Sequence, residues 1–117
     1  MSSADAASFS CKTTKEKSVG KDKINVIVSK KAKSENGLSV RAICSGSHGK
    51  VAHYKLDKLT VKYKVGKKTY KKTRKLGYVN DYYVKMPKNF KISKITVKYH
   101  KATNKEYKKL KANCWWT

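Results

Sequence analysis

Acidic residues and arginine are both scarce in this chain. Its 117 residues include 30 Lys and Arg but only 7 Asp and Glu, which gives a formal net charge of +23. Arginine occurs only at Arg41 and Arg74, so 28 of the 30 basic residues are lysine. A net charge of about 2–8 keeps a small domain in solution, and a larger excess raises self-repulsion in the folded state. The charge therefore predicts a polyanionic partner, and it is concentrated in residues 50–117.

The scarcity of arginine narrows the kind of partner. Arginine reads guanine edges and grips phosphates through two hydrogen bonds, whereas lysine is a hydrated point charge. Lysine suits many weak contacts along a repeating anion, so base-specific readout is not expected. An AT-rich genome also favours lysine over arginine. That bias would enrich glutamate as well, yet glutamate occurs only at Glu16, Glu35 and Glu106.

The chain also lacks any apolar run near the ~20 residues of a membrane span, and its length predicts one domain. Ala4 and Ala6 have the small-residue spacing of a signal-peptidase site. We interpret residues 1–7 as a disordered tail or signal-peptide remnant and residues 8–117 as a single β domain. We expect a secreted or cell-surface protein, and the alternative is a flexible tail on an intracellular one.

Three cysteines are present, Cys11, Cys44 and Cys114, without a Cys-x-x-Cys pair or a histidine at zinc-ligand spacing. No metal or cofactor is therefore expected. In a secreted protein the odd count predicts one disulfide and one free thiol. The preferred pair is Cys44–Cys114, because Cys44 ends an alternating run and Cys114 precedes Trp115 and Trp116. Three free thiols are the alternative. We expect a monomer, or a disulfide-linked dimer formed through an unpaired cysteine.

Alternation of apolar and polar residues is the strongest structural signal. It runs from Leu59 to Val65 with lysines at polar positions, which is typical of a half-buried strand. The segment Lys58–Lys64 recurs as Lys94–His100, and each copy is followed by a turn and by Tyr-Lys-Lys. We interpret each copy as a β-hairpin and therefore prefer strand to helix for residues 105–111. A chance echo in a biased composition is the alternative.

The rest of the chain also indicates strands. A hairpin is predicted over residues 24–45, with Asn36-Gly37 in its turn, and further strands over 8–13 and 78–84. Short strands separated by turns predict an all-β fold, a small antiparallel β-sandwich of about six to eight strands. Such a sandwich is compatible with an immunoglobulin-like architecture.

The alternation of apolar and polar residues also predicts where the lysines lie relative to one another. Outward lysines on one strand lie about 6.6–7 Å apart, and neighbouring strands lie about 4.8 Å apart, so they form a lattice of charge. Protection of exposed sheet edges explains some of these lysines, but not so many with so few acidic neighbours. The predicted polyanion-binding residues are Lys62, Lys64, Lys71, Lys72, Lys98, Lys101, Lys108 and Lys109.

Catalytic constellations are sparse. The carboxylates are scattered, and the sequence contains no Gly-rich phosphate loop or hydrolase motif. One cluster, His48, His53 and Asp57, has the residue types for acid–base cleavage of a phosphodiester. We nevertheless predict that the protein is not an enzyme.

The sequence thus predicts a secreted cationic domain that binds anionic polymers of a cell surface or matrix. These polymers include teichoic acid, acidic polysaccharide and extracellular nucleic acid. Antimicrobial or toxin activity would extend that function, because anionic envelopes attract cations. The alternatives are an intracellular nucleic-acid-binding protein without sequence preference and a small secreted nuclease or toxin.

Overall fold

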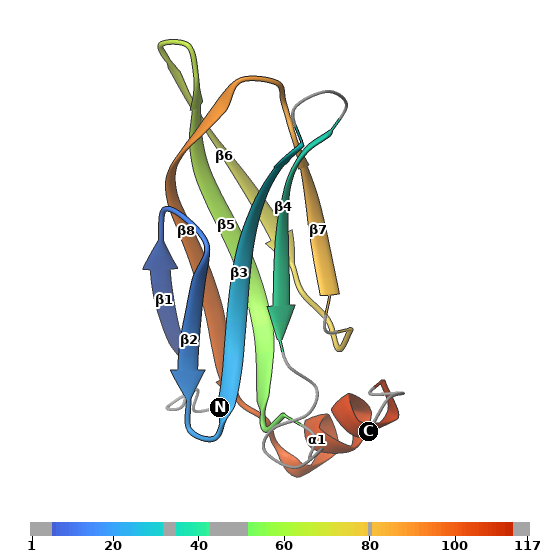
Figure 1. Cartoon of the computed structure of the whole chain (residues 1–117). Helices are drawn as coiled ribbons and strands as arrows, with labels where there is room; N and C mark the ends of the chain where they lie inside the picture. The colour runs from blue at the N-terminus through green and yellow to red at the C-terminus, as the bar shows by residue number, and fades with distance from the viewer. Residues whose placement is uncertain (1–5, 32–34, 43–51, 80, 114–117) are drawn as a thin grey trace.

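The computed structural model describes residues 6–31, 35–42, 52–79 and 81–113, and these form two packed four-stranded sheets and one terminal helix (Figure 1). Sheet A has the strand order β1-β8-β5-β6 and sheet B the order β2-β3-β4-β7, and all pairings are antiparallel. The predicted β-sandwich is therefore confirmed, while an immunoglobulin-like arrangement stays a prediction. The elements are β1 Ala7–Cys11, β2 Lys15–Val19, β3 Asp22–Lys31, β4 Glu35–Ala42, β5 Tyr54–Val65, β6 Lys68–Lys75, β7 Asp81–Met86, β8 Phe90–Lys101 and α1 Asn104–Ala112.

The core lies between the two sheets and is built from alternate residues of the central strands. Successive strand side chains point to opposite faces, so every second residue can be buried. On β5 the buried residues Leu59 and Val61 alternate with exposed or half-exposed polar ones. The largest side chains of this core with under 2% of their surface exposed are Phe90, Ile24, Leu38, Leu59, Ile95, Val26, Val40, Val61 and Val97. Each contributes about 1.5–3 kcal/mol on burial.

The two copies of the sequence repeat lie side by side as β5 and β8. Thr60 is directly opposite Thr96, and Leu59 is opposite Val97. The first copy continues into a hairpin with β6 through a turn in which Gly66 has φ +63°, as predicted. The repeat therefore forms the centre of one sheet rather than two separate hairpins.

The second copy does not continue into a hairpin, and the strand expected at residues 105–111 is wrong. These residues belong to helix α1, which begins with a capping box. The Glu106 amide donates to Thr103 Oγ1 at 3.2 Å, and the Thr103 amide donates to Glu106 Oε1 at 3.0 Å. The helix buries Leu110. The Thr-x-x-Glu spacing is a recognised helix-start signal, and it outweighs the partial resemblance to the first copy.

The hairpin predicted over residues 24–45 is confirmed in its described part as β3 and β4, while residues 43–45 lie outside the described residues, and its predicted turn is misplaced. Asn36 and Gly37 lie within β4, opposite Lys30 and Ser29 of β3. The Tyr83 ring lies against Gly37, where a β-carbon would collide with it. Glycine within a strand often marks such a close approach. Residues 32–34, between β3 and β4, lie outside the described residues.

Candidate functional site

The outer surface of sheet A is dominated by lysine. On β5 the exposed Lys62 and Lys64 alternate with the buried Val61 and Tyr63, and the pairing register gives the positions on β6 and β8 that share this side. Figure 1 shows β8, β5 and β6 adjacent along one side of the sandwich. We call the following set of eight exposed side chains the lysine face: Lys58, Lys62, Lys64, Lys71, Lys75, Lys91, Lys94 and Lys98.

The register aligns the lysine face into rows that run across the strands. Strand neighbours lie about 4.8 Å apart, so lysines of one row are directly opposed. The first row contains Lys98, Lys58 and Lys75, the second Lys94, Lys62 and Lys71, and the third Lys91 and Lys64. This arrangement places like charges at the closest cross-strand positions of a sheet.

A row of hydroxyl groups separates the first two lysine rows. It crosses all four strands and consists of Ser10, Thr96, Thr60 and Thr73, each opposite the next. Ser10 Oγ and Thr96 Oγ1 lie 3.0 Å apart and share a hydrogen bond. We call this set the hydroxyl row.

The lysine face carries almost no compensating negative charge. Across the described segments, none of its eight lysines forms an ion pair. The outer surface of sheet B differs, because Lys23 pairs there with Glu16 at 3.6 Å and the hydrophobic side chains of Ile27 and Tyr83 are exposed. Among the described residues, the outer surface of sheet A thus carries unpaired lysines in aligned rows, whereas the outer surface of sheet B is mixed in character.

Four of the eight lysines predicted as binding residues lie together on the lysine face: Lys62, Lys64, Lys71 and Lys98. Its other four, Lys58, Lys75, Lys91 and Lys94, were missed by the sequence reasoning. For Lys58, Lys91 and Lys94 a signal was present, because they take polar positions in strands whose alternate residues are apolar. Strand β6 shows no such alternation, so Lys75 had no comparable signal.

Lys72 does not belong to the lysine face. It is opposite the buried Val61, so it projects from the inner side of the edge strand β6. Its Nζ donates to the Lys85 carbonyl at 2.9 Å. Together with Arg74 it lines a hollow of about 380 Å³ whose apolar walls include Val61 and Val84.

The remaining predicted lysines also lie elsewhere. Lys101 is the exposed last residue of β8, and Lys108 and Lys109 are exposed on α1. Lys109 Nζ lies 5.4 Å from the centre of the Tyr78 ring, a cation–π distance. The sequence reasoning grouped Lys101, Lys108 and Lys109 with the other binding lysines because it interpreted the second repeat as a hairpin.

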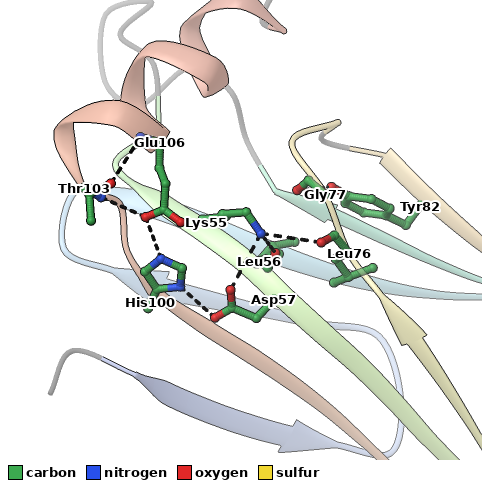
Figure 2. A network of polar contacts seen from close by, with 9 residues as sticks. All are labelled: Lys55, Leu56, Asp57, Leu76, Gly77, Tyr82, His100, Thr103 and Glu106. Carbon is green, nitrogen blue, oxygen red and sulfur yellow. Dashed lines mark hydrogen bonds and ion pairs between the residues drawn. The ribbon is translucent and has the colours of Figure 1, made fainter. Parts of the chain in front are cut away.

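A polar network joins sheet A to the start of α1 (Figure 2). Asp57 is the extra residue of a bulge in β5, where the register with β8 shifts between Leu56 and Lys58. His100 Nδ1 lies 2.8 Å from Asp57 Oδ2, and His100 Nε2 lies 2.7 Å from Glu106 Oε1. A neutral imidazole has only one N–H, whereas the protonated ring donates from both nitrogens. The geometry therefore favours the charged ring.

The pKa values follow from this geometry. Burial lowers the pKa of His100, but the hydrogen bonds and charges of Asp57 and Glu106 outweigh it, so the pKa lies above its ordinary value of 6.5. Burial raises the pKa of Glu106, but the Thr103 amide and His100 outweigh it, so that pKa lies below its ordinary value. The network is thus a charged clamp between strand and helix.

The predicted His48, His53 and Asp57 cluster takes a different form. His48 lies outside the described residues. The His53 amide donates to Asp22 Oδ2 at 2.5 Å, and its ring stacks on Tyr107 with 5.1 Å between centroids. Asp57 instead contacts His100, which the sequence reasoning did not single out. No local spacing signals that contact, because it depends on strand pairing and on the bulge.

The predicted disulfide cannot be placed, since Cys44 and Cys114 lie outside the described residues, as do Trp115 and Trp116. Cys11 is a free thiol that packs partly buried against the core. Burial raises its pKa, which Lys15 only partly offsets.

Comparison of the chain with protein-family models, with curated proteins and with solved structures finds no match. In the described segments no helix has the length and apolar character needed to cross a membrane. Those same segments contain no group of three or more His, Cys, Asp or Glu side chains placed to hold a metal ion.

Proposed function

We propose that the protein binds anionic polymers of a cell surface or matrix through the lysine face. The observation that carries this proposal is the direct opposition of lysines across strands: Lys58 with Lys98 and with Lys75, Lys62 with Lys94 and with Lys71, and Lys64 with Lys91. Like charges in such positions destabilise a sheet, by up to about 1 kcal/mol for each pair. Selection for stability alone would remove them, so they support a role that needs the charge.

Edge protection does not account for this pattern. It requires charge on the exposed edges of a sheet, and in sheet A those edges are β1 and β6. Lys58, Lys62, Lys94 and Lys98 instead lie on β5 and β8, the two central strands. A charged surface in the middle of a sheet supports recognition of a ligand that covers it.

The mechanism is polyvalent ion pairing. A polymer that covers the lysine face releases counterions and replaces lysine–lysine repulsion with lysine–anion attraction. Teichoic acid, acidic polysaccharide and extracellular nucleic acid all carry the required repeating charge. Antimicrobial or toxin action extends the proposal, because the same face is attracted to anionic envelopes. The proposed extracellular location rests on the spacing of Ala4 and Ala6.

The test compares two variants of equal net charge. The face variant replaces four lysines of the two central strands with glutamine: Lys58, Lys62, Lys94 and Lys98. The control variant replaces four exposed lysines elsewhere with glutamine: Lys67, Lys85, Lys88 and Lys105. Affinity for heparin, teichoic acid and duplex DNA is measured from low to high salt.

The face variant should lose affinity, and its salt dependence on duplex DNA should flatten by about 0.9 for each lost phosphate contact. The control should bind nearly as the wild type does. Equal losses in both variants would show that binding reflects net charge alone and not the lysine face.

A further inference from the structure

One sequence pattern recurs, in register, on three adjacent strands of sheet A. Lys-x-Thr-x-Lys occurs at residues 94–98 of β8, at 58–62 of β5 and at 71–75 of β6. Thr96, Thr60 and Thr73 are directly opposite one another, and the lysines on each side are also aligned. We call these nine outward side chains the threonine lane.

Strand geometry and side-chain length give the threonine lane the expected shape of a shallow channel. Alternate residues of a strand lie about 6.6–7 Å apart, so the two lysine rows lie about 13 Å apart with the hydroxyls midway between them. Threonine is short, whereas lysine carries its charge on a flexible four-carbon stem. The floor of the channel therefore presents hydroxyl groups, and its walls present ammonium groups.

The hydroxyl groups of the floor can select one class of anionic ligand over another, which the lysine charges alone cannot do. A hydroxyl both donates and accepts hydrogen bonds, so the hydroxyl row suits a ligand that carries hydroxyl and ether oxygens along its middle. The walls suit anionic groups along both edges of that ligand. A strand of acidic sugars has both features, because its rings carry hydroxyls and its carboxylates or sulfates project from the sides.

Nucleic acid fits the same surface less well. Single strands are held largely by stacking on aromatic rings, and the nine outward positions of the threonine lane carry only lysine and threonine. Tyr63 and Tyr70 face the other side of the sheet, where they stack on each other with 5.6 Å between centroids. A duplex would contact the lysine walls through phosphates and leave the threonine floor without a partner.

We propose that the polymer bound by the lysine face is an acidic polysaccharide whose chain runs across the strands along the threonine lane. This inference rests on the proposed function and names its ligand class. The lane measures about 10 Å from β8 to β6, so it accommodates a short segment of the sugar chain. The threonine hydroxyls hold the rings, and the lysine rows hold the charges.

The test removes hydroxyls without changing charge. Thr60→Val combined with Thr96→Val keeps the β-branched shape, and Thr69→Val, on the same side of β6 but outside the lane, is the matched control. Binding to polygalacturonate, polyphosphate and duplex DNA is measured at one salt concentration, and thermal unfolding checks the fold. The double variant should bind polygalacturonate about tenfold more weakly, as two lost hydrogen bonds imply. Its affinity for polyphosphate and DNA should be unchanged.

A Thr60→Ser, Thr96→Ser variant retains the hydroxyls and should bind polygalacturonate as the wild type does, which separates hydrogen bonding from folding defects. Wild-type affinity of the valine variant for polygalacturonate would overturn the inference. A wild-type protein that prefers duplex DNA to polygalacturonate would also overturn it, while the proposed function would stand. Failure to bind any of the three polymers would remove both.

Discussion

Replacing Lys62 with glutamate should make the protein more stable and a weaker binder at the same time. Lys62 is directly opposite Lys94 on β8 and Lys71 on β6. Cross-strand charge pairs change stability by about 0.2–1 kcal/mol each, unfavourably for like charges and favourably for opposite ones. Glutamate removes two repulsions and adds two attractions. Allowing for solvent screening at an exposed site, we expect a gain of about 1–2 kcal/mol in the free energy of unfolding.

Thermal unfolding followed by circular dichroism measures this gain. For a domain near this size, 1 kcal/mol corresponds to about 4–8 °C in Tm, so the Tm of the variant should rise by about 5–10 °C at low salt. At about 1 M salt the Debye length falls to about 3 Å, and the difference between variant and wild type should shrink. Affinity for heparin should fall in the same protein.

Lys85→Glu is the matched control. Lys85 is an exposed strand lysine on the other sheet, and its directly opposed residue is Gly37, which carries no charge. The same change of net charge should therefore raise the Tm less than half as much and leave heparin binding nearly intact. A destabilised Lys62→Glu protein would contradict the register that opposes the three lysines. A stabilised one that binds heparin like the wild type would exclude the lysine face as the binding surface.

Four further predictions concern the fold and the clamp that links the sheet to the helix. His100 has a raised pKa, so its contribution to stability should be complete below pH 6.5 and lost as the pH rises through its folded-state pKa; denaturant unfolding across this range should show the loss in wild type and not in His100→Gln. Glu106 has a lowered pKa, so its contribution should be present above its ordinary pKa and disappear in acid, which the same titration of Glu106→Gln tests. Thr103→Ala removes the helix cap and should cost about 1 kcal/mol and reduce helical signal in circular dichroism, whereas an unchanged signal would contradict the capping box. Leu59→Ala in the core should cost about 2–5 kcal/mol in urea unfolding, and a cost near zero would mean that the faces of β5 are reversed.

The sequence alone determined the class of fold and the orientation of many side chains. Alternation is a local property with a period of two residues, so Val61 and Tyr63 could be assigned to the core and Lys62 and Lys64 to the solvent without knowing any neighbouring strand. The concentration of charge after residue 50 likewise follows from composition, and three of the four strands of sheet A come from the second half of the chain.

Where the alternation was weak, the local signal was insufficient. Every residue of β6 is exposed, because an edge strand with an open inner side buries little, so the sequence did not show which of Lys71 and Lys72 points to the outer side of the sheet. Strand β2 was missed for a similar reason, since only Val19 is buried in it. Helix α1 was missed because the repeat was given more weight, although the sequence contains the Thr103–Glu106 capping pair that begins the helix.

Only the tertiary structure decided which strands are neighbours. Pairing β5 with β8 brings together residues 25 to 47 positions apart in the chain, and it aligns Thr60 with Thr96 and Lys62 with Lys94. Register depends on the burial of whole faces, because a slip of one residue would turn each core side chain outward. The same long-range packing sets the bulge that directs Asp57 to His100. The outward orientation of several lysines could be predicted from the sequence. Their alignment in rows, with hydroxyl groups between the rows, arises only when strands distant in the sequence pair.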